Sequence, residues 1–422
     1  MKVSQIIPIT LASLTCASSH SQPHPAGIIP RHVKRDDTPS TNHTGTVIVG
    51  ASGQIRAFDF NGTNFLSKSN ANISEAGKTA RWMAFKHPNI LYAVDENSNL
   101  TRYFNYNQTT GDLSPEKASF QGSTGVVHLA FNSDQTILVG SSYSQGQLDI
   151  WNTSSDGSLS LIKQVKLPAG SGPGGASQSQ PRAHQAVLDP TQRFFIVNDL
   201  GADRLHVLDA NKFEIVSTVP VVGAGSGPRH GAFLTLNGGN NATHYVVACE
   251  ISSVIQMFTV TDLGDSLKLD HLQTVSTFGP GLSPTNATTA RAGELVVSGG
   301  SGPANVYVSN RLTSNQTDSI SRFAVWKRSQ NDTTPELVFR ETIQTGGSSP
   351  RMFSFSKDSA QDVMYVANMD GQVALQAHQR CNDTVIGDCA MVGQPLAKFE
   401  GIDFYPAEKS GQGFGPQFVL EI

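Results

Sequence analysis

The sequence lacks the features that would suit it to nucleic acid, to a membrane or to a structural metal. Charged residues make up 15% of the chain, the formal net charge is -4, and no basic block occurs. This balance argues against nucleic acid or an anionic membrane surface as the main partner, and it leaves small acidic substrates open. No segment reaches 18 consecutive apolar residues, so we expect no membrane span. The four cysteines and 12 histidines show no zinc spacing, and we expect no metal and no other cofactor.

The start of the chain has the pattern of a targeting segment rather than of a folded element. Lys2 precedes an apolar run over residues 6–17, and the small residues that follow suit signal peptidase. A later dibasic pair, Lys34-Arg35, is typical of sites that processing proteases cut, although a merely exposed basic pair is the alternative. We therefore expect a secreted protein, either extracellular or in a cell wall. The assigned segments are 1–19 for a signal peptide, 20–35 for a propeptide and 36–45 for a short linker.

Potential glycosylation sites support export. The chain contains 11 N-x-S/T sequons, a density that favours a heavily glycosylated exported protein. Their asparagines are Asn42, Asn61, Asn72, Asn99, Asn107, Asn152, Asn241, Asn286, Asn315, Asn331 and Asn382.

The few cysteines fall into different classes. Cys16 leaves with the signal peptide. Cys381 and Cys389 bracket a short segment, and we predict that they close a surface loop by a disulfide in an oxidising compartment. Cys249 stands alone in the apolar run YVVAC, where we interpret it as a buried, inert thiol.

An internal repeat organises the rest of the chain. One pattern of strand, turn and second strand occurs six times, for example as VVHLAFNSDQTILVGSSY from Val126 and RAHQAVLDPTQRFFIVNDL from Arg182. The second positions of the aligned copies lie 46 to 64 residues apart, which is the size of one propeller blade. These positions are Trp82, His128, His184, His230, Glu294 and Met352.

The hairpins predict a closed ring of blades. Each hairpin is followed by further short segments that alternate apolar and polar residues, which gives four strands per unit. Strand-like segments at the two ends of the repeat region would join as one more blade and so remove the free edges of an open array. The prediction is an all-β, seven-bladed β-propeller over 46–422, with four antiparallel strands per blade and closure by the N- and C-terminal strands. Six or eight blades are the alternatives, and we expect a monomer.

Several strings resemble one particular family. RAHQAVLDPTQRFFIVNDLGADRLHVLDA, GSGPRHGAF, YVVACEISSVIQMF and YVSNR are similar to segments of the lactonase family of seven-bladed propellers, especially to secreted fungal members. That family includes 6-phosphogluconolactonase and carboxy-cis,cis-muconate lactonizing enzyme. The usual proline-aspartate-glycine turn is replaced by DPTQ or NSDQ, and an insertion carries the Asn241 sequon, so the departures concern loop shape.

Four residues are the predicted catalytic group. In an antiparallel hairpin, the start of the first strand lies beside the end of the second, so residues at both positions share one rim. His184 and Arg229 open their hairpins, while Glu250 and Arg311 close theirs. They also match the His, Arg, Glu and Arg proposed as catalytic in muconate-lactonizing members. Arginines supply planar forks for carboxylates, and a histidine or glutamate supplies proton transfer. Which of His184 and Glu250 is acid and which is base stays open.

Other repeat positions supply further candidates and alternatives. Arg229 and Arg311, together with His128, His230, Glu294 and Arg351, are the predicted substrate-binding residues. The alternative for the last four is that they only repeat the blade architecture. His184 has a structural alternative as a hydrogen-bonding partner of a neighbouring blade, Glu250 and Arg229 as a structural ion pair, and Arg311 as a rim charge.

The resemblance implies two candidate functions, and a third from another class stays open. The leading hypothesis is an enzyme similar to 3-carboxy-cis,cis-muconate cyclase, interconverting a polycarboxylate and its lactone without a metal. The first alternative is a lactone hydrolase similar to 6-phosphogluconolactonase, against which export argues because that phosphorylated intermediate belongs to cytosolic metabolism. The second alternative is a secreted or cell-wall glycoprotein or antigen that keeps the fold without catalysis. In either enzyme, the expected partner is a small anionic carboxylate or lactone.

Overall fold

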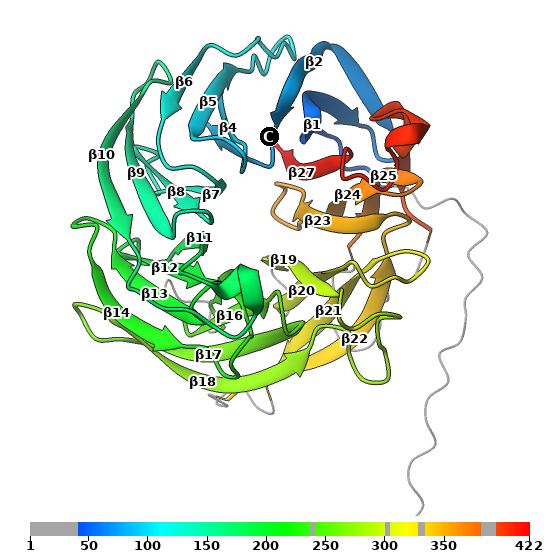
Figure 1. The fold of residues 1–422 in the computed structure, drawn as a ribbon. Coiled ribbons are helices and arrows are strands. Elements are labelled where there is room, and N and C mark those ends of the chain that lie inside the picture. The colour runs from blue at the N-terminus through cyan, green and yellow to red at the C-terminus, as the bar shows by residue number, and fades with distance from the viewer. Residues whose placement is uncertain (1–40, 237–240, 300–303, 328–333, 381–393) are drawn as a thin grey trace, which may run out of the picture. The chain divides into compact units, whose positions relative to one another are not determined.

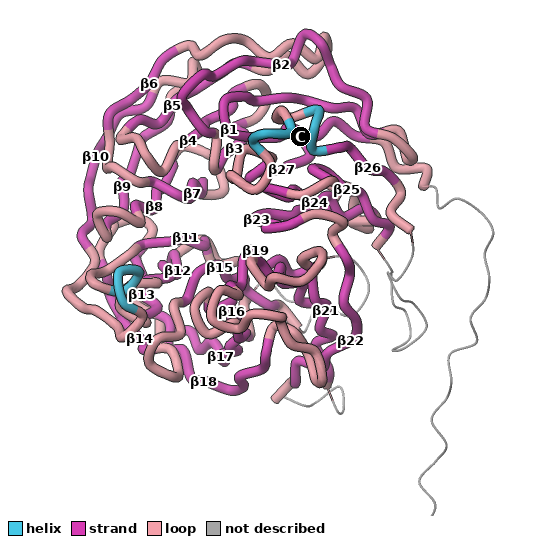
Figure 2. The backbone as a smooth tube through the Cα atoms, turned by 45° about the vertical axis from the view of Figure 1, so that its right-hand side comes forward, coloured by secondary structure: helices cyan, strands magenta, loops and turns pink. Residues whose placement is uncertain are grey.

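Seven antiparallel sheets follow one another around a ring (Figure 1). The computed structural model describes residues 41–236, 241–299, 304–327, 334–380 and 394–422. In this part of the chain six sheets have four strands each, and the sheet that contains both ends of the propeller has three. Strands and loops make up nearly all of the described residues, and helix occurs there only as short turns (Figure 2). The predicted seven-bladed β-propeller is therefore confirmed.

The blades are numbered here in chain order. Blade 1 contains β1 (Gly45–Phe60), β2 (Phe65–Thr79) and β27 (Pro416–Glu421). Blade 2 contains β3 (Trp82–Lys86), β4 (Ile90–Val94), β5 (Leu100–Asn105) and β6 (Ala118–Gln121), and blade 3 contains β7 (Val126–Phe131), β8 (Ile137–Ser142), β9 (Gln147–Thr153) and β10 (Leu159–Lys166). Blade 4 contains β11 (Ala183–Leu188), β12 (Phe194–Asp199), β13 (Arg204–Asp209) and β14 (Ile215–Pro220). Blade 5 contains β15 (Pro228–Leu234), β16 (His244–Cys249), β17 (Val254–Asp262) and β18 (Leu267–Ser276). Blade 6 contains β19 (Arg291–Val297), β20 (Asn305–Arg311), β21 (Ser319–Trp326) and β22 (Glu336–Gln344), and blade 7 contains β23 (Ser348–Phe355), β24 (Val363–Asp370), β25 (Val373–Gln379) and β26 (Ala397–Glu400). The short helical turns are η1 (Gly175–Gln178), η2 (Gly401–Asp403) and η3 (Ala407–Lys409).

The burial of each strand follows its place in the blade. All residues of β12 and β16 are buried, because these second strands have a neighbouring blade on both faces. The outermost strand β14 alternates between half-buried and exposed residues, since one of its faces meets solvent. A continuous apolar run therefore marks the interior strand, and alternation marks the outer one.

Apolar clusters fill the spaces between neighbouring blades. Between blades 5 and 6, for example, Val246 and Met257 pack in one buried cluster with Val306 and Phe323. Burial of a side chain of this size contributes about 1.5–3 kcal/mol, so each blade is stabilised mainly by its two neighbours.

The ring closes between the two ends of the propeller. β27 pairs with β1, with Val47 opposite Glu421 and Val49 opposite Val419. The C-terminal end of the chain lies beside β27 and β1 (Figure 1). Glu421 also accepts a hydrogen bond from Tyr365 Oη of blade 7 at 2.7 Å, so the last strand is held by two blades. This arrangement confirms the predicted closure by terminal strands.

Some predictions fall outside the part of the chain that the structure describes. They are the signal peptide, the propeptide, the first half of the linker (36–40), the Cys381–Cys389 disulfide and the sequons at Asn331 and Asn382. Cys249 is described, and it is fully buried as a free thiol, as predicted. Within the described residues, no helix has the length and apolar character needed to cross a membrane.

The described sequons mostly face solvent. The exposed asparagines are Asn42, Asn61, Asn72, Asn107, Asn152, Asn241 and Asn315, and the half-buried ones are Asn99 and Asn286. Their glycosylation stays a prediction.

Candidate active site at the axis of the propeller

β-bulges shape the inner strands where the candidate residues lie. In β15, Pro228 pairs with Cys249 and His230 pairs with Ala248, so Arg229 is an extra residue. A bulge bends its strand locally and redirects the side chain of the extra residue. The inner strand is bulged in six of the seven blades. The residues at the bulge position are Val127, His184, Arg229, Gly293, Arg351 and Gln417.

The bulges correct the repeat alignment in blade 4. His184 occupies the same position as Arg229 and Arg351, not that of His128, His230 and Glu294. The residue of blade 4 that corresponds to His230 is Gln185. Its Oε1 accepts hydrogen bonds from the backbone N–H of Gly231 at 2.7 Å and from Asn198 at 3.1 Å. Gln185 therefore joins blades 4 and 5, and His184 is placed one residue nearer the rim.

Glu250 stands between two arginines at the rim. Its Oε2 atom lies 2.8 Å from Nε of Arg229 and 2.9 Å from Nη2 of Arg311. Burial opposes ionisation of Glu250, but the neighbouring guanidiniums hold its pKa below the ordinary value. Burial also lowers the pKa of Arg229, to about 9, which leaves it charged at neutral pH. The side chain of Glu250 is 23% exposed, so this group meets solvent.

Glu96 forms a second group of the same kind. Its carboxylate lies 3.1 Å from Nη1 of Arg81 and 3.1 Å from Nη2 of Arg351. Arg351 belongs to blade 7 and Glu96 to blade 2, so this pair passes over blade 1. We call Arg229, Glu250 and Arg311 the first arginine group, and Arg81, Glu96 and Arg351 the second. Each group thus has two guanidiniums on one carboxylate, and Asp95 and Asp318 also act on Arg81 and Arg311.

Aromatic rings close the axis beneath these charges. The ring of His230 lies 5.0 Å from that of His184, 5.7 Å from that of His128 and 5.3 Å from that of Trp82. Trp82 comes from blade 2 and His230 from blade 5, so the rings meet across the axis. We call these four side chains the floor of the site, because Arg229, Arg311 and Arg351 at the rim act on the rings of His184 and His230.

The three histidines of the floor are neutral at physiological pH. Burial, together with the nearby positive charge, lowers the pKa of His128, His184 and His230 well below the ordinary value. Nδ1 of His128, Nδ1 of His184 and Nε2 of His230 are buried without a hydrogen-bond partner among the described residues. A buried polar atom left unpaired costs about 1–3 kcal/mol, so these nitrogens are suited to bind water or a ligand.

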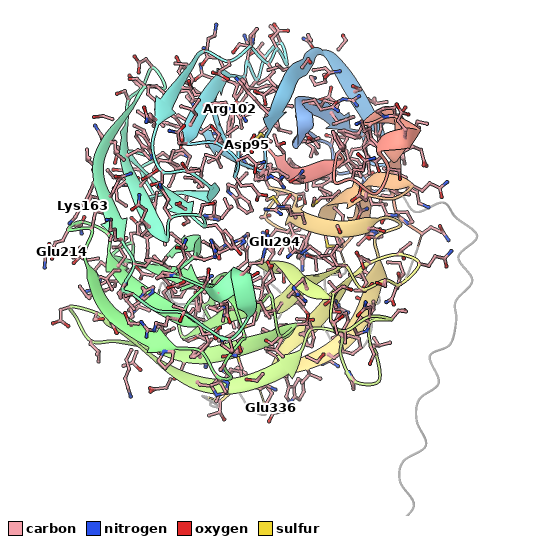
Figure 3. The ribbon with its side chains drawn as sticks, in the orientation of Figure 1. Asp95, Arg102, Lys163, Glu214, Glu294 and Glu336 are labelled. Carbon is pink, nitrogen blue, oxygen red and sulfur yellow. The ribbon has the colours of Figure 1, made fainter. Side chains whose placement is uncertain are left out.

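Glu294 supports the floor from blade 6. Its two carboxylate oxygens lie 3.0 and 2.9 Å from Nδ1 of His230. Glu294 lies close to the centre of the ring, whereas Lys163 and Glu214 lie on its outer edge (Figure 3). Burial raises the pKa of Glu294 to about 8.

Tyr143 is a candidate that the sequence reasoning missed. It follows β8, at the position that Glu250 occupies in blade 5, and its ring lies edge-on 5.9 Å from that of His184. The Arg182 guanidinium lies 4.6 Å from the centroid of the tyrosine ring. Burial raises the pKa of Tyr143, which keeps its hydroxyl protonated at neutral pH. The signal was in the sequence, because Tyr143 is the last residue of the repeat copy from Val126.

All eight predicted site residues gather at this end of the axis. Arg229, Glu250 and Arg311 are in contact, and Arg351 lies in the second arginine group. His128, His184, His230 and Glu294 form the floor and its support. Within the described ranges, no group of three or more His, Cys, Asp or Glu residues is arranged to hold a metal ion.

Two surface hollows lie away from this cluster. One has a volume of about 380 Å³ and includes Phe278 and Asn315, and the other has a volume of about 460 Å³ and includes Tyr106 and Asn107. Neither lining contains a histidine, an arginine or a carboxylate, so they offer no group for acid-base chemistry near neutral pH. Each contains the asparagine of a sequon.

The fold and the site together define a class: a seven-bladed propeller with arginines, carboxylates and histidines at one end of its axis. The family model "Lactonase, 7-bladed beta-propeller" matches residues 41–384. The chain belongs to this family.

Individual relatives agree with that assignment. An Arthroderma benhamiae protein named "Probable 6-phosphogluconolactonase" is 27% identical over 226 residues, which are 53% of this chain and 55% of that protein. The chain thus matches little more than half the length of that relative.

Solved structures show the same fold. The periplasmic gluconolactonase of Pseudomonas aeruginosa has a TM-score of 0.68 and 20% identity, with 90% of this chain and 99% of that chain covered. A Lactobacillus plantarum protein has a TM-score of 0.65 and 20% identity over 85% of this chain and 99% of its own. The Arthroderma relative is named as a probable 6-phosphogluconolactonase, which favours the lactone-hydrolase alternative over the muconate cyclase that led the sequence-based hypotheses.

Proposed function

We propose that this propeller hydrolyses a small anionic lactone, of the sugar-lactone type, at the rim of its axis. The observation that carries the proposal is the pairing of two guanidiniums on one carboxylate in each arginine group, beside a floor of neutral histidines on which these arginines act. Guanidiniums bind carboxylate and phosphate oxygens through paired hydrogen bonds. The names of relatives in the same family add 6-phosphogluconolactone and gluconolactone as the compounds to try first.

The geometry suits His184 as the base that activates water. Its imidazole is neutral and keeps an unpaired nitrogen, so it has a lone pair for the proton of an attacking water. Glu250 is less suited, because two guanidiniums hold its carboxylate and lower its basicity. This assignment makes Glu250 the residue that orients Arg229 and Arg311.

Arg229 is placed to stabilise negative charge on the substrate. Its Nη1 atom is buried and has no acceptor among the described residues. When water attacks the lactone carbonyl, the carbonyl oxygen becomes an oxyanion that this N–H group can bind. A preorganised donor of this kind gains strength where water is excluded.

Hydrolysis of matched lactones tests the proposal. The purified protein is assayed for hydrolysis of 6-phosphogluconolactone, gluconolactone and a carboxymuconolactone, with the spontaneous rate subtracted. We expect turnover of lactones, and a kcat for the phosphorylated lactone that falls about 10²- to 10³-fold in Arg229→Ala, as loss of an oxyanion donor predicts. No rate above the spontaneous one on any lactone would refute hydrolysis. In that case, the non-catalytic glycoprotein reading would gain support.

A further inference from the structure

The Glu294–His230 pair has the geometry of an oriented proton-transfer group. Glu294 lies in β19 and His230 in β15, so the pair joins the inner strands of neighbouring blades. Both carboxylate oxygens lie within 3.0 Å of Nδ1 of His230, which fixes the orientation of the ring. In a histidine ring, the hydrogen bond that one nitrogen makes determines whether the other nitrogen carries a proton.

The other nitrogen of His230 is left available. Nε2 is buried and has no hydrogen-bond partner among the described residues. A second buried histidine shows what a purely structural arrangement looks like: in His206, Nδ1 lies 2.9 Å from Thr218 Oγ1 and Nε2 lies 3.2 Å from Asp199. Both nitrogens of His206 are therefore used, whereas His230 has one free nitrogen in the floor of the site.

We propose that His230 is the general acid that protonates the departing ring oxygen of the lactone, and that Glu294 positions His230 and replaces the proton it gives. This inference rests on the hydrolysis proposed above. It adds a second histidine to the reaction, with the opposite task from that of His184.

The proposed cycle conserves protons. Water adds to the carbonyl carbon while its proton passes to His184, and the tetrahedral oxyanion then collapses. The bond between the carbonyl carbon and the ring oxygen breaks, and the ring oxygen takes the proton from Nε2 of His230. The proton of the Glu294 carboxyl moves to Nδ1, so the imidazole stays neutral and the negative charge ends on Glu294. The product carboxyl group ionises, and solvent and the protonated His184 restore the two groups.

The charges around the pair support this cycle. The groups that act on the pair are Arg229 of β15, Glu250 after β16, Arg311 of β20 and Arg351 of β23, and the floor adds His184 of β11 and His128 of β7. Burial raises the pKa of Glu294 to about 8, so the carboxyl carries its proton at neutral pH. Burial and the guanidiniums lower the pKa of His230, so its ring is neutral. The arginines then stabilise the carboxylate that forms in the reaction.

Kinetics against pH and leaving group test the proposal. In the parent protein, we expect kcat to fall as the pH rises through about 8, where Glu294 loses its proton. Glu294→Gln should lower kcat about 100-fold or more with KM changed less than threefold, because an amide cannot supply the proton. On an anionic lactone whose ring oxygen leaves as a phenoxide, the loss of kcat in Glu294→Gln should be at least tenfold smaller. Equal losses on both lactones, or a basic limb that is unchanged in Glu294→Gln, would overturn the proposal.

A control variant and an NMR measurement distinguish failure of this proposal from misfolding and from failure of the proposed function. Thr218→Val alters the surroundings of the buried His206 and should leave kcat and its pH profile as in the parent. Nitrogen-15 NMR of His230, assigned by its loss in His230→Gln, should show a proton on Nε2 at pH 6–7 and on Nδ1 above about pH 8. A proton on Nδ1 throughout would overturn the relay, even if the parent hydrolyses no lactone. Absence of hydrolysis alone would instead count against the proposed function.

Discussion

Nη2 of Arg311, at the end of one second strand, donates a hydrogen bond of 2.9 Å to Oε2 of Glu250, at the end of the second strand of the preceding blade. The same oxygen lies 2.8 Å from Nε of Arg229. A carboxylate shared by two guanidiniums is a weak base, because its charge is already compensated. It can still hold the two arginine side chains in a fixed orientation.

A comparison of two variants follows from this contact. We expect Glu250→Gln to lower kcat less than tenfold, since the amide oxygen still accepts from Arg311. His184→Gln should lower kcat by about 10²–10⁴, as removal of a general base does. Steady-state kinetics with 6-phosphogluconolactone measure both, and Glu214→Gln on the outer wall is the control. If Glu250→Gln is as impaired as His184→Gln, the base is Glu250 and our assignment is wrong.

Glycine at one bulge position makes room for the first arginine group. A Cβ atom on Gly293 would lie 2.4 Å from Ser309 Oγ and 2.9 Å from Nε of Arg311. We expect Gly293→Ala to move Arg311 and to raise KM for an anionic lactone roughly 10-fold or more, the loss of about one charged hydrogen bond. Gly299→Ala is the matched control, because its nearest neighbour is a Gln361 side-chain atom at 3.5 Å. Unchanged KM in Gly293→Ala would show that Arg311 does not need its present position.

The sequence predicted the blades well because each blade repeats a local pattern. Alternation and turn residues mark hairpins within a single copy, and the pairing of Val47 with Glu421 follows once an unpaired edge has to be avoided. The four predicted catalytic residues also lie together at one rim, as expected, since hairpin topology alone brings the start and the end of the two strands together; their roles stay a prediction.

The sequence could not predict how the side chains at that rim are directed. A bulge shifts the alternation of a strand by one residue, but the first four residues of β11 and of β15 are all buried, so no alternation marks Arg229 or His184 as the extra residue. For the same reason, the repeat alignment was one residue off at His184, and Gln185 was not considered. The contact of Arg351 with Glu96 could not be predicted without the geometry of the closed ring, because it joins blades that are not neighbours.

The buried histidines predict a loss of stability in acid. His128 is buried and its pKa is lowered, so below pH 6.5 the unfolded chain binds protons that the folded chain does not. The contribution is fully present above pH 6.5 and falls as the pH drops, by up to about 1.4 kcal/mol per pH unit for each such residue. We expect Tm to fall between pH 7 and pH 5, and to fall less in His128→Gln. The control is His271→Gln on an exposed site, and equal slopes in all three proteins would contradict the prediction.

Closure of the ring predicts a further stability effect, at Glu421. Its side chain is buried and accepts hydrogen bonds from Tyr365 Oη at 2.7 Å and from the backbone N–H of Lys357 at 3.1 Å, and it lies 2.8 Å from Nε2 of His43. Glu421→Ala leaves the first two donors without an acceptor, and we expect it to lower the free energy of unfolding by roughly 2–4 kcal/mol. Glu421→Gln should cost less, because the amide keeps an acceptor oxygen, and Glu400→Ala on an exposed site should cost nearly nothing. Urea unfolding followed by tryptophan fluorescence measures all three. β27 carries Glu421 and completes blade 1. If Glu421→Ala lowers the free energy of unfolding no more than Glu400→Ala does, the pairing of β27 with β1 alone holds the ring closed.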